Sequence, residues 1–415
     1  MRKFLTAILA LLAVASPARA QTIINPQPTA ASGQIPAYLG FADNRGMIPD
    51  AAASSGSAVQ FMVRSLRYAR ADMADPRPVF ACGWYVGSNN VEIVQAGTYT
   101  YKASIQLPNG TIIPYKFGGN ASGTCQGGEN ISPDAPSNVS IARGSTYVIY
   151  YWFDSPNGYV FTNQYAGLAG DAFNTGTTTA DLTTTGMAGS SPGSVGIGPI
   201  GVIATITQRS FFIIGDSITG GQGTDERDVS GDFGVLARIV GPRRGYVNSG
   251  RPSVLANQFT STNASRRIAL GNAYASDIIS GYGINDALNS IAATTIATTL
   301  RTIRGYFPTK RFYQATVTPT ANGSGTACVA LDGSDQVLNA TASGIIDTLN
   351  GLIKLGAVSG NAINFTGYVD VRAAVELIPG SQKVKPGWYN TDCLHPKLGY
   401  RLAAPITPGA ELLQW

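Results

Sequence analysis

Between residues 59 and 160 the hydrophobic positions follow the two-residue period of β-strands. Residues 99–107 alternate in this way, residues 108–110 (Pro-Asn-Gly) provide a hairpin turn, and residues 111–117 continue the pattern. Residues 146–153 are an almost unbroken run of aromatic and β-branched side chains that ends at a turn rich in Pro and Gly. Short strands separated by such turns predict a sandwich of antiparallel sheets.

From about residue 206 onward, the pattern changes to strands that alternate with helices. Short apolar runs suited to buried strands are separated by longer stretches with helical spacing. We expect strands at residues 209–214, 245–248, 275–282, 311–317 and 365–371, and helices at residues 291–306 and 335–355. Strands joined through helices imply right-handed crossovers and a parallel sheet that is covered on both faces.

The stretch between these two patterns has a different composition. Residues 175–185 and 189–198 are rich in Gly, Thr and Ser and carry almost no charge, which is typical of a linker or a long loop. We therefore expect a leader at residues 1–20, a β-rich accessory domain at 21–165, a Gly/Ser/Thr-rich linker or loop at 166–205, and an α/β domain at 206–415.

The first twenty residues have the pattern of a targeting segment. Arg2 and Lys3 give a positive end, residues 4–14 are apolar, and residues 18–20 (Ala-Arg-Ala) form a small-x-small cleavage pattern before Gln21. The alternative is a membrane anchor, but the apolar run is shorter than the ~20 residues that cross a bilayer. We expect a cleaved signal peptide, no membrane span, and a secreted or periplasmic protein.

Composition narrows the possible partners. The chain has 415 residues, of which 13% are charged, and a net charge of +5 at pH 7. Three positive charges, on Arg2, Lys3 and Arg19, belong to the expected leader, so about +2 (5 − 3) remains for the rest. This charge is too weak and too dispersed for a nucleic-acid binder. The single histidine, His395, excludes polyhistidine metal sites and mechanisms that use two imidazoles.

Four cysteines are present, and two of them lie in each half of the chain. In an exported protein an even number of cysteines favours disulfides over free thiols. Of the three possible pairings, we expect Cys82–Cys125 and Cys328–Cys393. Cys393 lies two residues from His395, so a cysteine nucleophile is an alternative there, although a disulfide explains the residue more simply.

Polar residues that are candidates for catalysis follow the ends of the expected strands. Residues 215–217 follow the first strand of the α/β region, residues 248–253 the second, residues 283–286 the third, and residues 392–395 the last. Ligands of open parallel sheets bind at the carboxyl ends of the strands. We therefore expect these four loops to converge on one pocket.

Ser217, His395 and Asp392 have the side chains of a nucleophile, a base and an orienting acid. A neutral hydroxyl attacks esters poorly without a base, and His395 is the only imidazole available. Asp392 precedes it by three residues and can fix its tautomer and stabilise the imidazolium. The chain order Ser, Asp, His excludes the trypsin-like and subtilisin-like arrangements, and Thr219 stands where an α/β-hydrolase elbow has its second Gly.

Acyl transfer also requires donors for the developing oxyanion. Asn285 offers a side-chain amide, and the backbone N–H groups of Ser217 and of a residue in the turn at 248–253 can complete the hole.

Three motifs resemble those of the SGNH hydrolases, also called the GDSL family. Gly-Asp-Ser-Ile at residues 215–218 resembles the first block and implies that Ser217 is the nucleophile and first oxyanion donor. Gly-Ile-Asn-Asp at residues 283–286 resembles a later block and implies that Asn285 is the side-chain donor. Asp392-x-x-His395 resembles the final block and implies the base and its orienting acid.

The second block departs from the family pattern. The family has Asn followed five residues later by the oxyanion Gly, whereas here Ser253 stands five residues after Asn248, and Gly250 is the nearest glycine. Because a backbone N–H serves with either residue, Gly250 and Ser253 both stay candidates. The resemblance covers residues 208–402. It implies a flavodoxin-like three-layer α/β catalytic domain preceded by the all-β sandwich-like domain, with no cofactor and no metal.

Each candidate residue also has a structural interpretation. Ser217 can cap the following helix, His395 can be a surface histidine, and Asp392 can be an ordinary turn residue. Asn285 can close a loop, and Asp286 is better explained as a helix N-cap than as a catalytic acid.

The aromatic residues and the acidic loop have two interpretations as well. Trp388 and Tyr389 flank the base loop and either line the substrate pocket or pack beneath that loop. The loop at residues 224–228 is a solvated loop or a rim of the substrate site. Five aromatics of the β-rich half are better explained as sandwich core than as a sugar-stacking platform: Trp84, Tyr85, Tyr150, Tyr151 and Trp152.

The leading hypothesis is a secreted serine ester hydrolase that acts on an acylated substrate. Within the family resemblance, an exported enzyme with a β accessory domain is most similar to a carbohydrate O-acetyl esterase that acts on polysaccharide. A lipid, aryl or thioester esterase on the same residues is the alternative. A polysaccharide-binding protein without activity is a third hypothesis, which the departure in the second block supports.

Overall fold

The structure is a computed structural model that describes residues 34–54, 57–162, 170–189, 198–222, 231–322, 328–357, 363–390, 392–397 and 407. The expected leader and the acidic loop at residues 224–228 lie outside the described residues. Within the described ranges, no helix is long and apolar enough to cross a membrane.

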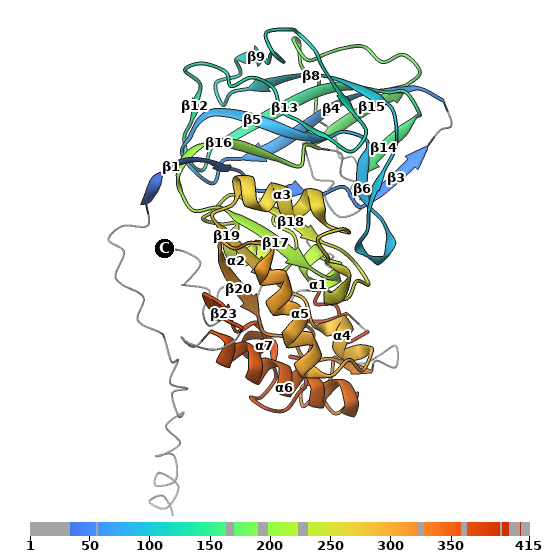
Figure 1. Ribbon diagram of the computed structural model, residues 1–415, viewed down its shortest axis with the longest axis vertical. Coiled ribbons are helices and arrows are strands. Elements are labelled where there is room, and N and C mark those ends of the chain that lie inside the picture. Colours follow the sequence, from blue (N-terminus) through green and yellow to red (C-terminus); the bar gives the residue numbers. More distant parts are fainter. Residues whose placement is uncertain are drawn as a thin grey trace, which may run out of the picture. The chain divides into compact units, whose positions relative to one another are not determined.

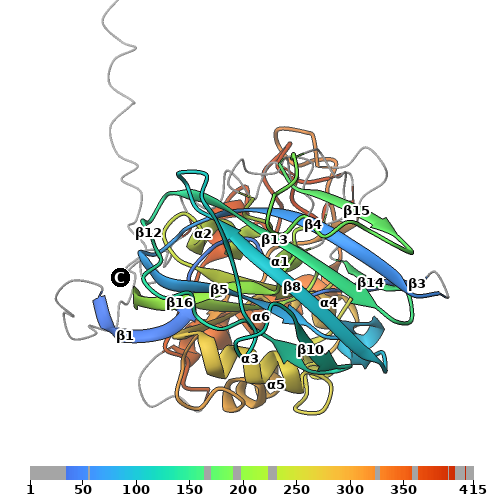
Figure 2. The same ribbon diagram turned by 90° about the horizontal axis from the view of Figure 1, so that it is seen from above.

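The first part of the chain forms two antiparallel sheets. One sheet consists of β1 (Gln34–Phe41), β16 (Gly201–Gln208), β5 (Met73–Ala81) and β11 (Asn130–Ile131), and β12 (Ser140–Ile141) also pairs with β5. The other consists of β10 (Gly123–Gln126), β8 (Thr98–Gln106), β13 (Thr146–Ser155), β4 (Val59–Tyr68) and β15 (Ala172–Gly176), with β9 (Ile112–Pro114) on β8. Figure 2 shows β4, β13 and β8 running side by side. The strands that the alternating pattern predicted are present.

Aromatic and aliphatic side chains from both sheets form one core. Phe80 of β5 lies 5.0 Å from Tyr101 of β8 and 4.9 Å from Tyr151 of β13, measured between ring centroids. From β16, Val202 and Ala204 belong to the same cluster of buried residues. Because stacked sheets pack about 10 Å apart with interdigitated side chains, these contacts define a sandwich.

The aromatic residues considered for sugar stacking mostly contribute to packing. Trp84 and Tyr151 are buried in the two main cores. Tyr150 and Trp152 lie on the opposite face of β13 and pack with Leu182, which comes from the stretch expected to be a linker. The described residues of that stretch, 166–205, therefore include strand β15, the start of strand β16 and a segment that covers the sandwich.

The second part of the chain is built on a parallel sheet. Its strand order is β2 (Gly46–Met47), β18 (Tyr246–Gly250), β17 (Phe211–Gly215), β19 (Asp277–Ser280), β20 (Arg311–Ala315) and β23 (Gly367–Val369), and every pair is parallel. Without β2, the order along the chain is 2-1-3-4-5, which is that of flavodoxin-like sheets. All residues of β17, β18 and β19 are buried, as expected for strands covered on both faces.

Seven helices accompany this sheet in the described residues: α1 (Ser217–Gly220), α2 (Val235–Val240), α3 (Ser265–Tyr274), α4 (Ile284–Leu288), α5 (Ala293–Gly305), α6 (Ala340–Gly356) and α7 (Val371–Val375). Figure 1 shows α5 and α6 side by side. α6 begins later than the spacing predicted because Asn339 caps it, accepting the N–H of Ala342 at 3.1 Å. Residues 337–338 form the short strand β22 instead.

The remaining elements are short. They are β3 (Ala51–Ser54) paired with β14 (Tyr159–Thr162), β6 (Trp84–Val86) paired with β7 (Glu92–Val94), β21 (Ala321–Asn322) paired with β22 (Val337–Leu338), and the 3-10 turns η1 (Ser88–Asn90) and η2 (Ala256–Gln258).

The β-rich part and the α/β part of the chain contribute to a common sheet and to a common core. β2 comes from the β-rich part but forms the edge of the parallel sheet beside β18. On β16, Val202 and Ala204 face the sandwich core, whereas Ile203 belongs to the core of the α/β part. Side chains alternate between the two faces of a strand, so the β16 sheet is buried on both sides.

Candidate active site

Ser217 stands at the first position of helix α1, directly after strand β17. The preceding Asp216 is the N-cap, and its side-chain oxygen Oδ1 accepts the N–H of Ile218 at 3.0 Å. The interpretation of Ser217 as a helix cap is therefore wrong. α1 ends after four residues at Gly221, whose φ of 86° lies in the left-handed region. The tight strand–helix turn holds the Ser217 side chain at the carboxyl end of the sheet.

His395 links Ser217 to Asp392 through its two ring nitrogens. Nε2 lies 2.9 Å from the Ser217 Oγ, and Nδ1 lies 2.7 Å from the Asp392 Oδ2. The other carboxylate oxygen of Asp392 accepts the N–H groups of Leu394 and His395, both at 3.0 Å. With the proton on Nδ1, the ring donates to the carboxylate and leaves Nε2 able to accept the hydroxyl proton.

Asp392 is a carboxylate in this arrangement. Partial burial raises its pKa, but the N–H groups of His395 and Leu394 and the imidazole outweigh burial, so the pKa lies below its usual value. The side chain is 46% exposed. Asp392 therefore stays ionised through the neutral range, while water screens part of its charge.

The loop that carries the base is fixed by backbone pairing and by a disulfide. Asn390 donates its N–H to the His395 carbonyl at 2.9 Å, and Lys397 donates to the Trp388 carbonyl at 2.8 Å. Cys393 is bonded to Cys328, and both residues are fully buried. The other predicted disulfide, Cys82–Cys125, is also present, so both expected pairings are confirmed.

The two aromatics beside this loop differ in their burial. Tyr389 is buried and belongs to the core of the α/β part, which favours the packing interpretation for it. Trp388 is partly buried, and the ammonium of Lys385 lies 4.5 Å from the centre of its ring.

Asn285 and Asp286 connect helix α4 to the turn at residues 251–258. Asn285 donates from Nδ2 to the Val254 carbonyl at 2.9 Å, which places its amide beside that turn. The carboxylate of Asp286 accepts the Ala256 N–H, at 3.2 and 3.1 Å to its two oxygens. Gly283 occupies the cap position of α4, so the expectation that Asp286 is the N-cap is wrong. The bond from Asp286 to Ala256 leaves no signal in the sequence pattern, because the two residues lie 30 positions apart.

Gly250 and Ser253, the two candidates for the second oxyanion N–H, differ in the hydrogen bonding of that N–H. Gly250 donates its N–H to the side chain of Asn248 at 2.9 Å, and a Cβ on Gly250 would lie 2.3 Å from the Gly220 nitrogen. Gly250 therefore allows β18 to approach α1. Ser253 is exposed, has a φ of 60°, and its N–H has no partner among the described residues. For a serine, this left-handed conformation is uncommon and has an energetic cost.

Asn248 organises the nucleophile turn from the neighbouring strand. Its Nδ2 donates to the carbonyls of Thr219 at 2.8 Å and Phe233 at 3.1 Å, while its Oδ1 accepts the Gly250 N–H. This buried amide is fully hydrogen-bonded, which is what burial of such a group requires.

Asp216 is a buried carboxyl next to the nucleophile. Burial raises its pKa to about 7, against the opposing effect of the N–H groups of Ile218 and Thr219. Its second oxygen, Oδ2, has no hydrogen-bond partner among the described residues. The nearby carboxylate of Asp286 adds to the rise.

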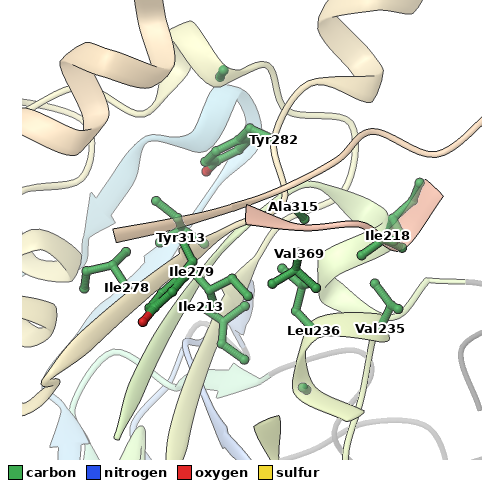
Figure 3. Close-up of a cluster of buried hydrophobic side chains, with 14 of the residues drawn as sticks. Ile213, Ile218, Val235, Leu236, Ile278, Ile279, Tyr282, Tyr313, Ala315 and Val369 are labelled. Atoms are coloured by element: carbon green, nitrogen blue, oxygen red, sulfur yellow. The ribbon is translucent and has the colours of Figure 1, made fainter. Parts of the chain in front are cut away.

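A small cavity is lined by α1 and by residues at the carboxyl ends of β19 and β20. It has a volume of about 20 Å³. Its lining includes Ile218 and Ile284, the neighbours of Ser217 and Asn285, and also Leu236 and Val371. Figure 3 shows Ile218, Val235 and Leu236 gathered in this region of the core. A space of this size holds about one small group, such as a methyl or a water.

Known proteins resemble this chain in structure but not in overall sequence. No protein-family model matches the chain, and no curated protein sequence matches it. Similar solved structures include a member of the lipolytic protein G-D-S-L family from Veillonella parvula, with a TM-score of 0.33 and 20% identity, which covers 47% of this chain and 94% of its own.

Two further solved structures are described as esterases or lipases. One is Est24, a carbohydrate acetylesterase from Sinorhizobium meliloti, with a TM-score of 0.33 and 16% identity, covering 50% of this chain and 98% of its own. The other is a lipase from a goat rumen metagenome, with a TM-score of 0.35 and 14% identity, covering 48% of this chain and 95% of its own. The description of the Veillonella parvula structure names the family that the motifs resemble.

Proposed function

We propose that the protein is a serine ester hydrolase of the SGNH type, with Ser217 as nucleophile, His395 as base and Asp392 as the acid that orients the base. The observation that carries this proposal is the 2.9 Å contact between the His395 Nε2 and the Ser217 Oγ. The only imidazole of the chain lies within proton-transfer reach of a hydroxyl at a strand end.

In the first half of the reaction, Ser217 attacks the ester carbonyl. His395 removes the hydroxyl proton at Nε2 as the bond from Oγ to the carbonyl carbon forms, and Asp392 stabilises the imidazolium. The oxyanion accepts hydrogen bonds from the Ser217 N–H, from the second hydrogen of the Asn285 amide and from the Ser253 N–H. We prefer Ser253 to Gly250 for the last donor, because the Gly250 N–H already donates to Asn248.

The first half ends when the tetrahedral intermediate collapses. Its bond to the alcohol oxygen breaks, and His395 gives its proton to that oxygen, so the alcohol leaves and an acyl-enzyme remains. In the second half, water attacks the acyl carbon while His395 takes a proton from the water. As this second intermediate collapses, the bond from the acyl carbon to the Ser217 oxygen breaks, His395 returns the proton to that oxygen, and the carboxylic acid leaves.

We further propose that the substrate is an O-acetylated carbohydrate. This choice follows the family resemblance, in which an exported enzyme with a β accessory domain is most similar to a carbohydrate O-acetyl esterase. In this proposal residues 206–415 are the flavodoxin-like catalytic domain and the β-rich part is an accessory domain. Two disulfides favour an oxidising compartment, secreted or periplasmic.

The test uses the chain without its expected leader (residues 21–415) and the Ser217→Ala variant of the same chain. We expect p-nitrophenyl acetate turnover in the first and a loss of at least about 10³-fold in the second, because the nucleophile is removed. Equal rates would refute the role of Ser217. Acetate release from several acetylated polysaccharides identifies the alcohol. A preference for acyl chains longer than acetyl would favour a lipid, aryl or thioester esterase.

A further inference from the structure

A hairpin of the β-rich part, β6–η1–β7, contacts the elements that carry the candidate oxyanion donors. On its backbone, Glu92 donates to the Asn263 carbonyl at 3.0 Å, just before helix α3. At its tip, Asn89 and Asn90 both have left-handed φ values, 56° and 64°. Asn tolerates this conformation better than most residues, and consecutive residues in it are rare.

The hairpin is fixed to the α/β part by a buried ion pair. Glu92 and Arg267 are 1% and 0% exposed in their side chains, and Glu92 Oε1 accepts from the Arg267 Nε at 3.1 Å. The other guanidinium nitrogens donate to the Asn90 side chain at 2.5 Å and to its carbonyl at 2.6 Å. A buried guanidinium is stable only when its N–H groups have hydrogen-bond acceptors. Because Asn90 provides two of these acceptors, its side chain and its carbonyl are both fixed against Arg267.

Asn90 in turn contacts the segment that carries Asn285. Its Nδ2 donates to the hydroxyl of Tyr282 at 3.0 Å, and both side chains are buried. Tyr282 lies between strand β19 and helix α4, three residues before Asn285. The neighbouring Asn89 accepts a hydrogen bond from Gln258, the last residue of the turn at 251–258, at 3.3 Å.

A second contact from the β-rich part holds the start of the same turn. The Asp50 carboxylate, which is 4% exposed in its side chain, pairs with Arg251 at 3.2 Å. Arg251 lies two residues before Ser253, and its N–H donates to the Gly215 carbonyl at 3.0 Å, beside the nucleophile turn. The turn thus forms an ion pair with Asp50 at its first residue and an exposed hydrogen bond with Asn89 at its last residue.

We propose that Asp50 and Asn90, two residues of the β-rich part, are positioning residues for the oxyanion donors at Ser253 and Asn285. The proposal rests on the ester hydrolase function proposed above. Oxyanion donors act only when they are fixed in advance about 3 Å from the developing charge, and a displacement of about 1 Å costs up to about 100-fold in rate. The β-rich part therefore belongs to the catalytic unit.

The experiment uses full-length variants with p-nitrophenyl acetate as substrate and a boronic acid, whose serine adduct mimics the tetrahedral intermediate. For Asn90→Ala and Asp50→Ala we expect kcat per titrated active site to fall about 10- to 100-fold, with KM changed by less than about two-fold. The inhibition constant of the boronic acid should rise by a similar factor. A variant that is merely less stable loses titratable sites and leaves this constant unchanged.

Three further variants sharpen the result. Asn90→Ala combined with Tyr282→Phe should lose no more activity than Asn90→Ala alone, because both changes break the same contact. Asp50→Glu keeps the charge and should recover most of the rate. Asn174→Ala removes an exposed amide of the same part and should behave as wild type.

The outcomes separate the two proposals. Wild-type kcat and inhibition constant in both Asp50→Ala and Asn90→Ala, together with an inactive Ser217→Ala, would overturn the positioning role alone. Should one of these variants fail to fold, the other and Tyr282→Phe decide the question. Full activity in Ser217→Ala would overturn the ester hydrolase function itself.

Discussion

The His395 Nε2 lies 2.9 Å from the Ser217 Oγ, although 178 positions of sequence separate the two residues. The strand β17 and the cap at Asp216 fix the hydroxyl. A disulfide and two backbone hydrogen bonds hold the loop that carries the imidazole. Each group is positioned by its own local structure, so the contact does not depend on a flexible side chain reaching across a cleft.

Replacing Asp392 by Asn should lower kcat without abolishing it. The neutral amide no longer stabilises the imidazolium, but Asp392 is 46% exposed, so its charge is partly screened. We expect a loss of about 10- to 1000-fold, smaller than that for removal of the base. Steady-state kinetics at neutral pH measures it. Asp134→Asn is the control, since Asp134 also accepts two backbone N–H groups, those of Gly118 and Gly119, but lies in the β-rich part.

Ser253→Gly should keep kcat within about two-fold of wild type, because the backbone N–H that we assign to the oxyanion hole is retained. Glycine also adopts a φ of 60° without strain, so the unfolding free energy should change by less than about 1 kcal/mol. Ser253→Val, whose branched side chain disfavours this φ, should lose at least about 10-fold in kcat. A large loss in Ser253→Gly would instead assign the role to the hydroxyl.

Removing the Cys328–Cys393 bond by a double change to Ala should reduce both stability and kcat. The bond closes a loop of sequence separation 65, and loop-closure entropy gives it about 4 kcal/mol of stabilisation. Since Cys393 lies two residues from His395, we expect a looser base loop as well. Cys82 and Cys125 form the matched control, with a sequence separation of 43 and a similar expected stability loss. Equal kcat in both double variants would contradict the coupling to the base loop.

The buried carboxyl of Asp216 should make stability fall as pH rises. Its pKa is about 7 in the folded protein, against 3.8 for an unperturbed Asp carboxyl. Between these two values the unfolded chain loses the proton and the folded protein keeps it, so the free energy of unfolding decreases with pH. Chemical denaturation of wild type and Asp216→Asn from pH 4 to 7.5 measures this effect. Over this range we expect the unfolding free energy of wild type to fall by up to a few kcal/mol relative to that of the variant, at about 1.4 kcal/mol per pKa unit. Parallel curves would contradict the raised pKa.

The sequence predicted the α/β sheet well because its signals are local. β17 and β19 contain short apolar runs that end at Gly and Ser, and β17 and β20 agree with the predicted runs to within a few residues. The residues at the strand ends followed from the same rule, since parallel strands present their carboxyl ends at one edge. The cysteine pairs followed from their distribution between the two halves.

Other features depend on tertiary contacts that leave no periodic signal. β2 has only two residues, too few to show a period. The bonds of Asp286 to Ala256 and of Asn90 to Tyr282 join segments that are distant in sequence. The left-handed conformation of Ser253 was not visible either, because serine is not a residue that marks positive φ.

The pairing of β2 with β18 affects how this chain folds during synthesis and how its two parts can evolve. Gly46 pairs with Val247, so the sheet acquires its outer edge from a segment that leaves the ribosome long before the strands it joins. Such a distant closure forms late, and until then β18 exposes unpaired backbone groups that invite association with other chains. Recombination that replaced the N-terminal β-rich part by another domain would remove β2 and leave β18 unpaired on that side. We therefore expect the two parts to have been inherited together.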